Sequence, residues 1–204
     1  MARALIPEVK VILIGEYGVG KSSIFRRFAT NTFTTDSSKR STLGLDFYAK
    51  PFQENNVKIQ LWDTGGMERV ASVTSSYYKH SEAALLVFAL DNSDSFHALS
   101  QHLLEVVTYA ETARIFLCGN KCDLQPQVTD QDIEAFCEET SDCIAGYFKT
   151  SCKTGEGIEE MFTTIASSLS THVKSRHDLL HLDESSFQVT QPPEDSSLQD
   201  DCLC

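Results

Sequence analysis

The stretch Gly15-Glu16-Tyr17-Gly18-Val19-Gly20-Lys21-Ser22 decides the fold of this chain. It fits the pattern G-x-x-x-x-G-K-[ST] of a phosphate-binding loop. An apolar run at 8–14, suited to a buried strand, comes just before it, and Ile24, Phe25 and Phe28 follow at helical spacing. Strand, loop and helix in this order are the context that the motif requires.

The residue types in this loop explain how it would hold a phosphate. Glycines let the backbone curl so that successive N–H groups point inward, and the following helix adds its partial positive charge. Lys21 brings a full charge to the outer phosphates, and the Ser22 hydroxyl can ligate Mg²⁺. The alternative, a glycine-rich turn with a chance Lys-Ser pair, is disfavoured because both flanks fit. The candidate phosphate-binding residues are Gly15, Tyr17, Gly18, Val19, Gly20, Lys21, Ser22 and Ser23.

Length and composition limit the class of protein. The 204 residues suit one domain plus a tail, with a core that needs no disulfides. The net charge of −12 argues against a nucleic-acid binder and against electrostatic adhesion to anionic lipid. Seven cysteines, an odd number, lie scattered through apolar runs, which is typical of reduced, cytosolic usage. The first residues lack the apolar region of a signal peptide, and no apolar run approaches the length of a membrane span.

Strand-like and helical patterns alternate along the chain and predict an α/β fold. Asn55-Asn56 separates two runs of period two, which indicates a β-hairpin, whereas the later strands alternate with helices, which implies parallel pairing. We therefore expect a mostly parallel sheet of about six strands with helices on both faces, and ligands at the carboxyl ends of the strands. The predicted strands are 8–14, 45–52, 57–62, 83–90, 114–119 and 145–149, and the predicted helices are near 21–30, 68–79, 94–110, 129–140 and 157–173.

An acidic motif follows the strand that ends in Leu61-Trp62. It reads Asp63-Thr64-Gly65-Gly66. A carboxylate at a strand end opposite a phosphate loop is what a second Mg²⁺ holder needs, and the Gly66 N–H could reach a terminal phosphate. Asp63 is therefore a candidate for the metal site.

Two further motifs point to the base of a nucleotide. In Asn120-Lys121-Cys122-Asp123 the carboxylate can accept two hydrogen bonds from guanine, whereas adenine offers no such donor pair and would leave the carboxylate unpaired. An ordinary Asn-Lys-x-Asp turn would be the better interpretation if the motif stood alone, but its order and position favour a base site. In Thr150-Ser151-Cys152-Lys153 the backbone N–H groups could meet the guanine carbonyl.

The four motifs, in this order, resemble those of the small GTPases of the Ras superfamily, and most closely those of the Rab family, over roughly residues 8–172. The segments 41–47, 58–64 and 75–78 resemble the Rab sequences in and around the two switch regions. The resemblance implies the P-loop small-GTPase fold, with GTP or GDP and Mg²⁺ as cofactors. It implies that Ser22, Thr42 and Asp63 serve the metal, that Phe33 packs against the guanine, and that Lys121 and Lys153 flank it. It also implies an effector-binding trio of Phe47, Trp62 and Tyr77, for which ordinary core packing is the alternative.

Three departures from the family pattern concern hydrolysis and the first switch. Met67 stands where the family carries a glutamine that orients the attacking water, and a thioether has no N–H to donate. Tyr17 stands where a small residue is usual, and its ring could crowd the outer phosphate or exclude a partner's arginine. The segment 34–41 is about two residues longer than expected for a Rab. Catalytic candidates are therefore Lys21, the degenerate position Met67 and the modulating Tyr17.

The chain ends in an acidic, proline-bearing segment that cannot bury a core, so we expect a G domain at 1–173 and a disordered tail at 174–204. The ending Cys202-Leu203-Cys204 resembles the doubly geranylgeranylated Rab terminus, and two prenyl chains give stable anchoring. A redox-active or metal-binding cysteine pair is the alternative. The resemblance further implies a monomer on the cytosolic face of a membrane. Expected partners are an exchange factor, a GAP, a GDP-dissociation inhibitor, a prenylation escort protein and GTP-dependent effectors.

Two functions follow from these features. The first is a GTPase that cycles between GTP and GDP on a membrane in vesicle traffic. The second is a platform that stays loaded with GTP and recruits effectors with little hydrolysis, which Met67 and Tyr17 favour in isolation. A P-loop ATPase or kinase is disfavoured by Asn120–Asp123.

Overall fold

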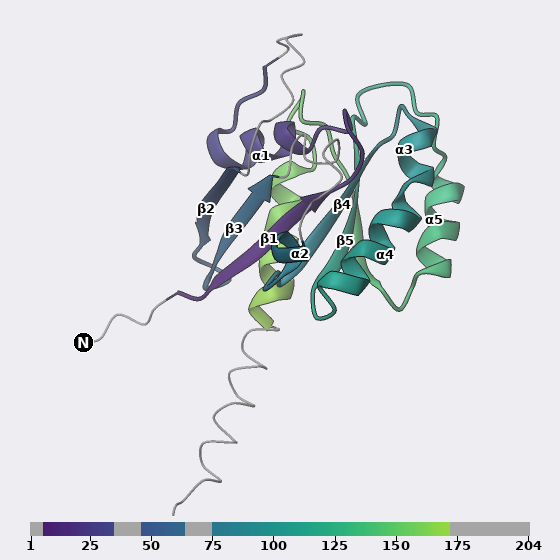
Figure 1. Ribbon diagram of the computed structural model, residues 1–204. Coiled ribbons are helices and arrows are strands. Elements are labelled where there is room, and N and C mark those ends of the chain that lie inside the picture. Colours follow the sequence, from purple (N-terminus) through teal and green to yellow (C-terminus); the bar gives the residue numbers. More distant parts are fainter. Residues whose placement is uncertain (1–5, 35–45, 64–74, 172–204) are drawn as a thin grey trace, which may run out of the picture.

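The computed structural model describes residues 6–34, 46–63 and 75–171, and within them six strands form a single sheet with helices on both faces (Figure 1). The strand order is β2-β3-β1-β4-β5-β6, with β2 antiparallel to β3 and every other neighbouring pair parallel. The predicted α/β class is therefore confirmed. The strands are β1 (Glu8–Ile14), β2 (Asp46–Phe52), β3 (Val57–Asp63), β4 (Ala83–Ala89), β5 (Arg114–Asn120) and β6 (Ile144–Lys149).

The helices agree with the sequence pattern except in one place. The single helix predicted at 94–110 is two helices that meet at Ala98, whose ψ of −12° departs from the usual helical value. The buried Ser95 hydroxyl of the first helix bonds to the backbone of Ala89 at the end of β4. Of the helix expected at 68–79, residues 68–74 lie outside the described part. None of the helices in the described part is long and apolar enough to cross a membrane. The helices are α1 (Lys21–Thr30), α2 (Ser75–Tyr78), α3 (Ser93–His97), α4 (Leu99–Tyr109), α5 (Asp130–Glu139) and an unlabelled helix at 158–171.

Two apolar layers hold the helices to the sheet. The central strand β4 is buried along its whole length, as expected for a parallel strand covered on both faces. Along β1, Val9, Val11 and Leu13 pack with α1 and the helix at 158–171, whereas Ile12 and Ile14 pack with α2, α4 and α5. The alternation of side chains along a strand thus assigns each helix to one face.

The antiparallel edge of the sheet is the predicted hairpin. Asn56 has a left-handed backbone with φ 53°, and its N–H donates to the carbonyl oxygen of Gln53 at 3.1 Å. Asparagine tolerates this conformation better than most residues. The hairpin leaves β2 as the outermost strand, with Pro51 opposite Lys58 of β3.

Candidate functional site

The phosphate loop connects β1 to α1 at the carboxyl edge of the sheet, as the sequence predicts. Gly15 and Gly20 have φ of 145° and 107°, which side chains rarely adopt. A Cβ atom at Gly15 would lie 2.1 Å from the carbonyl oxygen of Val87, and one at Gly20 would lie 2.2 Å from Nδ2 of Asn120. The loop therefore presses directly against β4 and β5, and only glycine fits at these two positions.

Lys21 is the charged residue of this loop, and it is only 5% exposed. Its ammonium group donates hydrogen bonds to the carbonyl oxygens of Gly15 at 2.6 Å and Glu16 at 2.9 Å. These bonds hold the charge within the curl of the loop, which suits a bound phosphate. Tyr17 belongs to the same loop, and its side chain is 38% exposed.

Asp63 ends β3 and is buried, with 1% exposure. It pairs in register with Leu13 of β1, two residues before the phosphate loop begins. A carboxylate here and the Ser22 hydroxyl on the first turn of α1 belong to the same edge of the sheet, and both are oxygen ligands of the kind that Mg²⁺ prefers. These residues thus fit the metal that the sequence implies. Three other predicted site residues, Thr42, Gly66 and Met67, lie outside the described part of the chain.

A cavity of about 230 Å³ opens beside the phosphate loop. It brings together residues of the phosphate loop, the Asn120–Asp123 motif and the Ser151–Lys153 loop, together with the aromatic ring predicted to face the base. Leu124, which is 42% exposed, also lines it, and the sequence motifs alone did not indicate this residue. The lining residues are Gly18, Gly20, Ser23, Phe33, Asn120, Lys121, Asp123, Leu124, Cys152 and Lys153.

The charged groups of this cavity are held by neighbouring side chains. The Ser151 hydroxyl donates to Oδ1 of Asp123 at 2.5 Å, and Nζ of Lys153 lies 3.7 Å from Oδ2. Lys121 has a left-handed backbone with φ 64°, and its Nζ lies 3.2 Å from Oδ1 of Asp91. The Ser151 hydroxyl thus orients the carboxylate of Asp123, and Lys121 is paired with Asp91, which lies outside the Asn120–Asp123 motif.

Asn120 joins the two halves of the site. It is 1% exposed, and its amide nitrogen donates to the carbonyl oxygen of Val19 at 2.8 Å. Its amide oxygen accepts a hydrogen bond from the backbone N–H of Cys152 at 3.3 Å. A single buried amide therefore connects the phosphate loop to the loop at 151–153.

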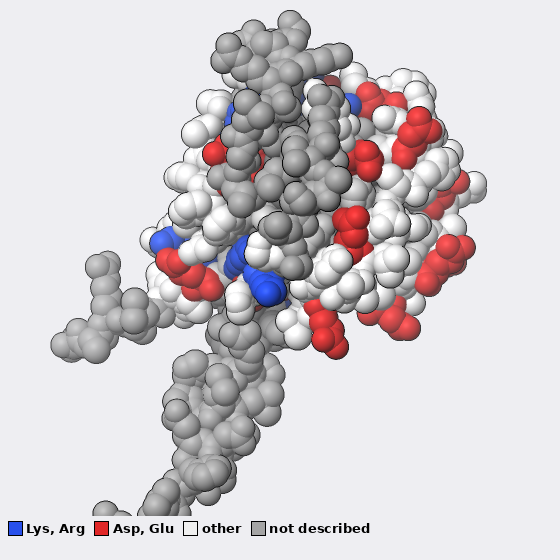
Figure 2. Space-filling view, viewed as in Figure 1, with Lys and Arg blue, Asp and Glu red and all other residues white. Residues whose placement is uncertain are grey.

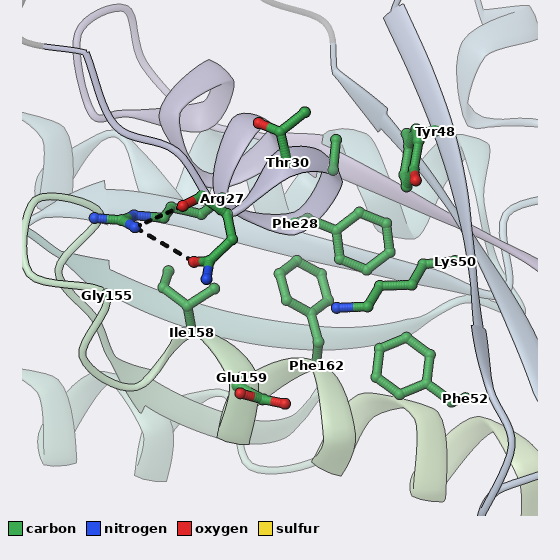
Figure 3. A pocket seen from close by; sticks show the side chains of 12 residues that line it. Arg27, Phe28, Thr30, Tyr48, Lys50, Phe52, Gly155, Ile158, Glu159 and Phe162 are labelled. Carbon is green, nitrogen blue, oxygen red and sulfur yellow. Dashed lines mark hydrogen bonds between the residues drawn. The ribbon is translucent and has the colours of Figure 1, made fainter.

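Arg27 is a positioning residue that the motifs did not reveal. From α1 it donates to the carbonyl oxygens of Cys152 at 2.6 Å and Lys153 at 2.8 Å, and to that of Asn31 at 3.0 Å. Figure 3 shows its guanidinium group at the edge of a second cavity, of about 390 Å³, between α1, β2 and the helix at 158–171. Nothing in the sequence separates this arginine from any other on an amphipathic helix.

The buried cysteines beside the site are inert at neutral pH. Burial raises the pKa of both the Cys118 thiol and the Cys152 thiol to about 12. Their thiols therefore stay protonated and serve as small packing groups. All five cysteines of the described part are free thiols, namely Cys118, Cys122, Cys137, Cys143 and Cys152.

The three aromatic residues of the predicted effector trio lie together but differ in exposure. Phe47 is 58% exposed and stacks on Trp62, with ring centroids 5.0 Å apart and an interplanar angle of 20°. Tyr77 is buried at 4% exposure, and its hydroxyl donates to the carbonyl oxygen of Trp62 at 3.0 Å. One member therefore faces solvent, and another belongs to the core.

The charge of the visible surface is mostly acidic. Figure 2 shows acidic side chains spread over the side occupied by α3, α4 and α5, with a small basic group toward the lower left. A surface of this kind does not suit a nucleic-acid backbone.

Comparisons with known proteins agree with this geometry. The family model described as "Ras family" matches residues 10–171. The Ras-related protein Rab-4 of Dictyostelium discoideum is 36% identical over 206 residues, covering 96% of this chain and 97% of the relative. The Ras-related protein Rab-9A of Mus musculus is 36% identical, over 82% of this chain and 86% of the relative. The Ras-related protein RABD2c of Arabidopsis thaliana is 34% identical, over 82% of this chain and 83% of the relative. The chain therefore belongs to the Ras family of small GTPases, as a divergent member of the Rab family.

Proposed function

We propose that this protein is a membrane-anchored Rab switch that hydrolyses GTP slowly on its own. As a Rab-family protein it is a small GTPase of vesicle trafficking that binds GTP and GDP with Mg²⁺. The observation that carries the residue-level proposal is the cavity that joins the phosphate loop to Phe33, Lys121 and Asp123. The phosphate loop suits the phosphates of a guanine nucleotide, and Phe33, Lys121 and Asp123 suit its base.

The base-binding roles follow from the contacts of the cavity. Asp123 accepts the guanine N1–H and exocyclic amine, because its carboxylate is already oriented by Ser151. Phe33 packs against the base, and Lys121 and Lys153 flank it. The loop at 151–153 supplies backbone N–H groups toward the guanine carbonyl, and Arg27 and Asn120 hold that loop in place.

The phosphate-binding roles belong to the other half of the site. Lys21 and the loop N–H groups bind the outer phosphates, and the N–H of Gly66, a residue outside the described part, would serve the terminal one. Ser22 and Thr42 would hold Mg²⁺ directly, and Asp63 would hold it through water. When bound, the metal neutralises charge on the phosphates during hydrolysis.

The slow hydrolysis rests on Met67 and Tyr17. Phosphoryl transfer to water depends on positioning and on charge stabilisation, and a thioether cannot donate a hydrogen bond to the water. We expect the phenol of Tyr17 to crowd the outer phosphate. A partner GAP can supply a glutamine of its own as well as an arginine, so regulated hydrolysis is retained.

A second candidate function is a platform that stays loaded with GTP and recruits effectors. The same two residues favour it, because a switch without intrinsic hydrolysis remains in its GTP form wherever exchange occurs and no GAP acts. The two functions differ in the nucleotide carried by the resting protein.

Membrane anchoring is assigned to Cys202 and Cys204, which lie outside the described residues. Two geranylgeranyl chains hold a protein on a bilayer stably where one is marginal. An escort protein for prenylation, a GDP-dissociation inhibitor, an exchange factor, a GAP and effectors that engage Phe47, Trp62 and Tyr77 complete the proposed cycle.

The test of slow hydrolysis is single-turnover hydrolysis by the wild type, Met67→Gln and Met67→Gln with Tyr17→Ser. Intrinsic hydrolysis in glutamine-bearing GTPases is on the order of 10⁻⁴ s⁻¹, and we expect the wild type to be about tenfold slower or more. Met67→Gln should accelerate the reaction, and the double variant should accelerate it further. Equal rates in all three proteins, or a wild-type rate typical of glutamine-bearing relatives, would contradict the proposal.

A further inference from the structure

Lys10 lies on β1, and its side chain extends to the end of α2. Its ammonium group donates hydrogen bonds to the carbonyl oxygens of Tyr77 at 2.6 Å and of Lys79 at 2.9 Å. The last carbonyls of a helix have no partner within the helix and carry a partial negative charge. Lys10 therefore satisfies the end of α2 with a cation supplied by the sheet.

The same ammonium group contacts two rings of the aromatic trio. It lies 5.1 Å from the ring centroid of Trp62 and 5.4 Å from that of Tyr77. These distances are within the range of cation–π attraction. The hydroxyl of Tyr77 in turn bonds to the backbone of Trp62. One charge thus fixes both rings relative to each other.

The backbone of Lys10 is itself held in place. Its N–H donates to Oε2 of Glu82 at 2.6 Å, and its carbonyl oxygen accepts from the N–H of Glu82 at 2.9 Å. The partial burial of the side chain lowers the pKa of the ammonium group, and the carboxylate of Glu82 opposes this shift. A lysine that gives up water in this way must gain its contacts from the protein.

We propose that Lys10 is the positioning residue of the aromatic surface, fixing Trp62 and Tyr77 in the geometry that Phe47 completes. The proposal rests on the effector role of these rings given above. It implies that this surface is built on the central strand β1 and not on the switch segments alone. A partner that recognises the stacked Phe47 and Trp62 rings then meets a preformed site.

Trp62 gives the proposal a direct readout, because it is the only tryptophan in the chain. We would compare Lys10→Met, which keeps most of the side-chain length but has no side-chain N–H donor, with Lys10→Arg, which keeps the charge and the donors. Lys58→Met is the matched control, since Lys58 lies on neighbouring β3 and pairs with Glu8 at 2.6 Å, away from the trio. All variants are made in the full chain loaded with GDP.

In Lys10→Met we expect acrylamide to quench Trp62 about twofold more strongly, and the amides of 76–80 to exchange about tenfold faster. Lys10→Arg should stay close to the wild type, and Lys58→Met should be unchanged. Unchanged quenching and exchange in Lys10→Met, or an equal change in Lys58→Met, would overturn the proposal.

A titration of the wild type keeps the proposal testable if Lys10→Met does not fold. Among the described residues, the titratable groups near the ammonium are the carboxylate of Glu82 and the phenol of Tyr77, whose ring it faces. Raising the pH toward the ordinary lysine range removes the charge of Lys10, whereas an arginine stays charged. Trp62 emission should therefore change with pH in the wild type and change less in Lys10→Arg. Identical titrations would overturn the proposal.

The proposed nucleotide site is tested separately by the release of fluorescent GDP. Lys10 is not among the described residues that line that cavity, so release should be the same in all these proteins. Loss of GDP binding by the wild type would contradict the proposed function without bearing on Lys10. Unaltered acrylamide quenching of Trp62 in Lys10→Met would contradict the role of Lys10 without bearing on GTP binding.

Discussion

The side-chain amide of Asn120 donates a 2.8 Å hydrogen bond to the carbonyl oxygen of Val19, which joins the end of β5 to the phosphate loop. Gly20, the next residue, leaves the space that this amide occupies. The parts of the proposed site assigned to the phosphates and to the base are therefore joined by one hydrogen bond. A change on either side of this bond should therefore alter the rate at which the nucleotide dissociates.

Asn120→Ala should release nucleotide faster. It leaves the buried Val19 carbonyl without its donor, which costs about 1–3 kcal/mol, or roughly fivefold to 150-fold in the dissociation rate if the loss falls on the bound state. Release of fluorescent GDP measures the effect. Gln101→Ala, which removes an amide from the exposed face of α4, is the control, and similar rates in both variants would contradict the prediction.

Asp123→Asn should weaken GTP binding and shift the preference toward xanthine nucleotides. The C2 carbonyl of xanthine requires a donor, which an asparagine amide supplies and a carboxylate does not. Competition between GTP, XTP and ATP in equilibrium binding measures the shift. Equal binding of ATP and GTP by the wild type would show that the base site has been misassigned.

Arg27→Met should loosen the loop at 151–153. The guanidinium bonds to the carbonyl oxygens of Cys152 and Lys153 are charge-assisted, and losing such a bond costs about 1.5–3 kcal/mol, so we expect GDP release at least about tenfold faster. Arg26→Met is the matched control, because Arg26 lies on the same helix and, among the described residues, its guanidinium group donates to the Thr34 hydroxyl on the exposed side. A similar acceleration in both variants would mean that the effect comes from α1 in general.

Ser22→Asn should impair the metal site. The substitution removes a proposed Mg²⁺ ligand, so the protein should favour GDP or lose its nucleotide, bind its exchange factor persistently and fail to bind effectors. The measurement is GTP and GDP affinity as a function of Mg²⁺ concentration. A Mg²⁺ dependence equal to that of the wild type would argue against the role of Ser22.

Changing both Cys202 and Cys204 to Ser should leave the protein in the cytosol. Changing one should weaken membrane retention, because a single prenyl chain binds a bilayer only marginally. Salt washing should not release the intact lipidated protein, since the anchor is apolar. Fractionation of cells that express each form measures this, and a membrane-bound double variant would refute the assignment.

Much of the fold could be predicted because its signals are local. The apolar runs gave strands β1 to β6 within a residue or two, and the glycine pattern placed the phosphate loop between β1 and α1. The break at Ala98 could not be predicted, because alanine is the strongest helix former and the helical period continues across it.

The site was predictable to the extent that its residues belong to motifs. Phe33, Asp123 and Lys153 do line one cavity. The roles of Arg27 and Asp91 could not be predicted, because their partners are distant in sequence and a charged residue on a helix or loop usually indicates only a solvated surface. Lys10 escaped for a similar reason: in an alternating strand, a lysine suggests nothing beyond an exposed position.

Pro51 has a consequence for how copies of this protein meet each other. The N–H of Lys58 donates to the carbonyl oxygen of Pro7, on the β1 side of β3. Pro51 is the residue opposite Lys58 in the antiparallel pair, so the backbone nitrogen of Pro51 points away from β3 and toward the open edge of the sheet. A proline nitrogen has no hydrogen to donate, so a strand from a second molecule would find a gap in the ladder at that point. We expect this outer edge to resist the strand-to-strand stacking that leads to aggregation, which would leave the exposed aromatic ring of Phe47 available to heterologous partners.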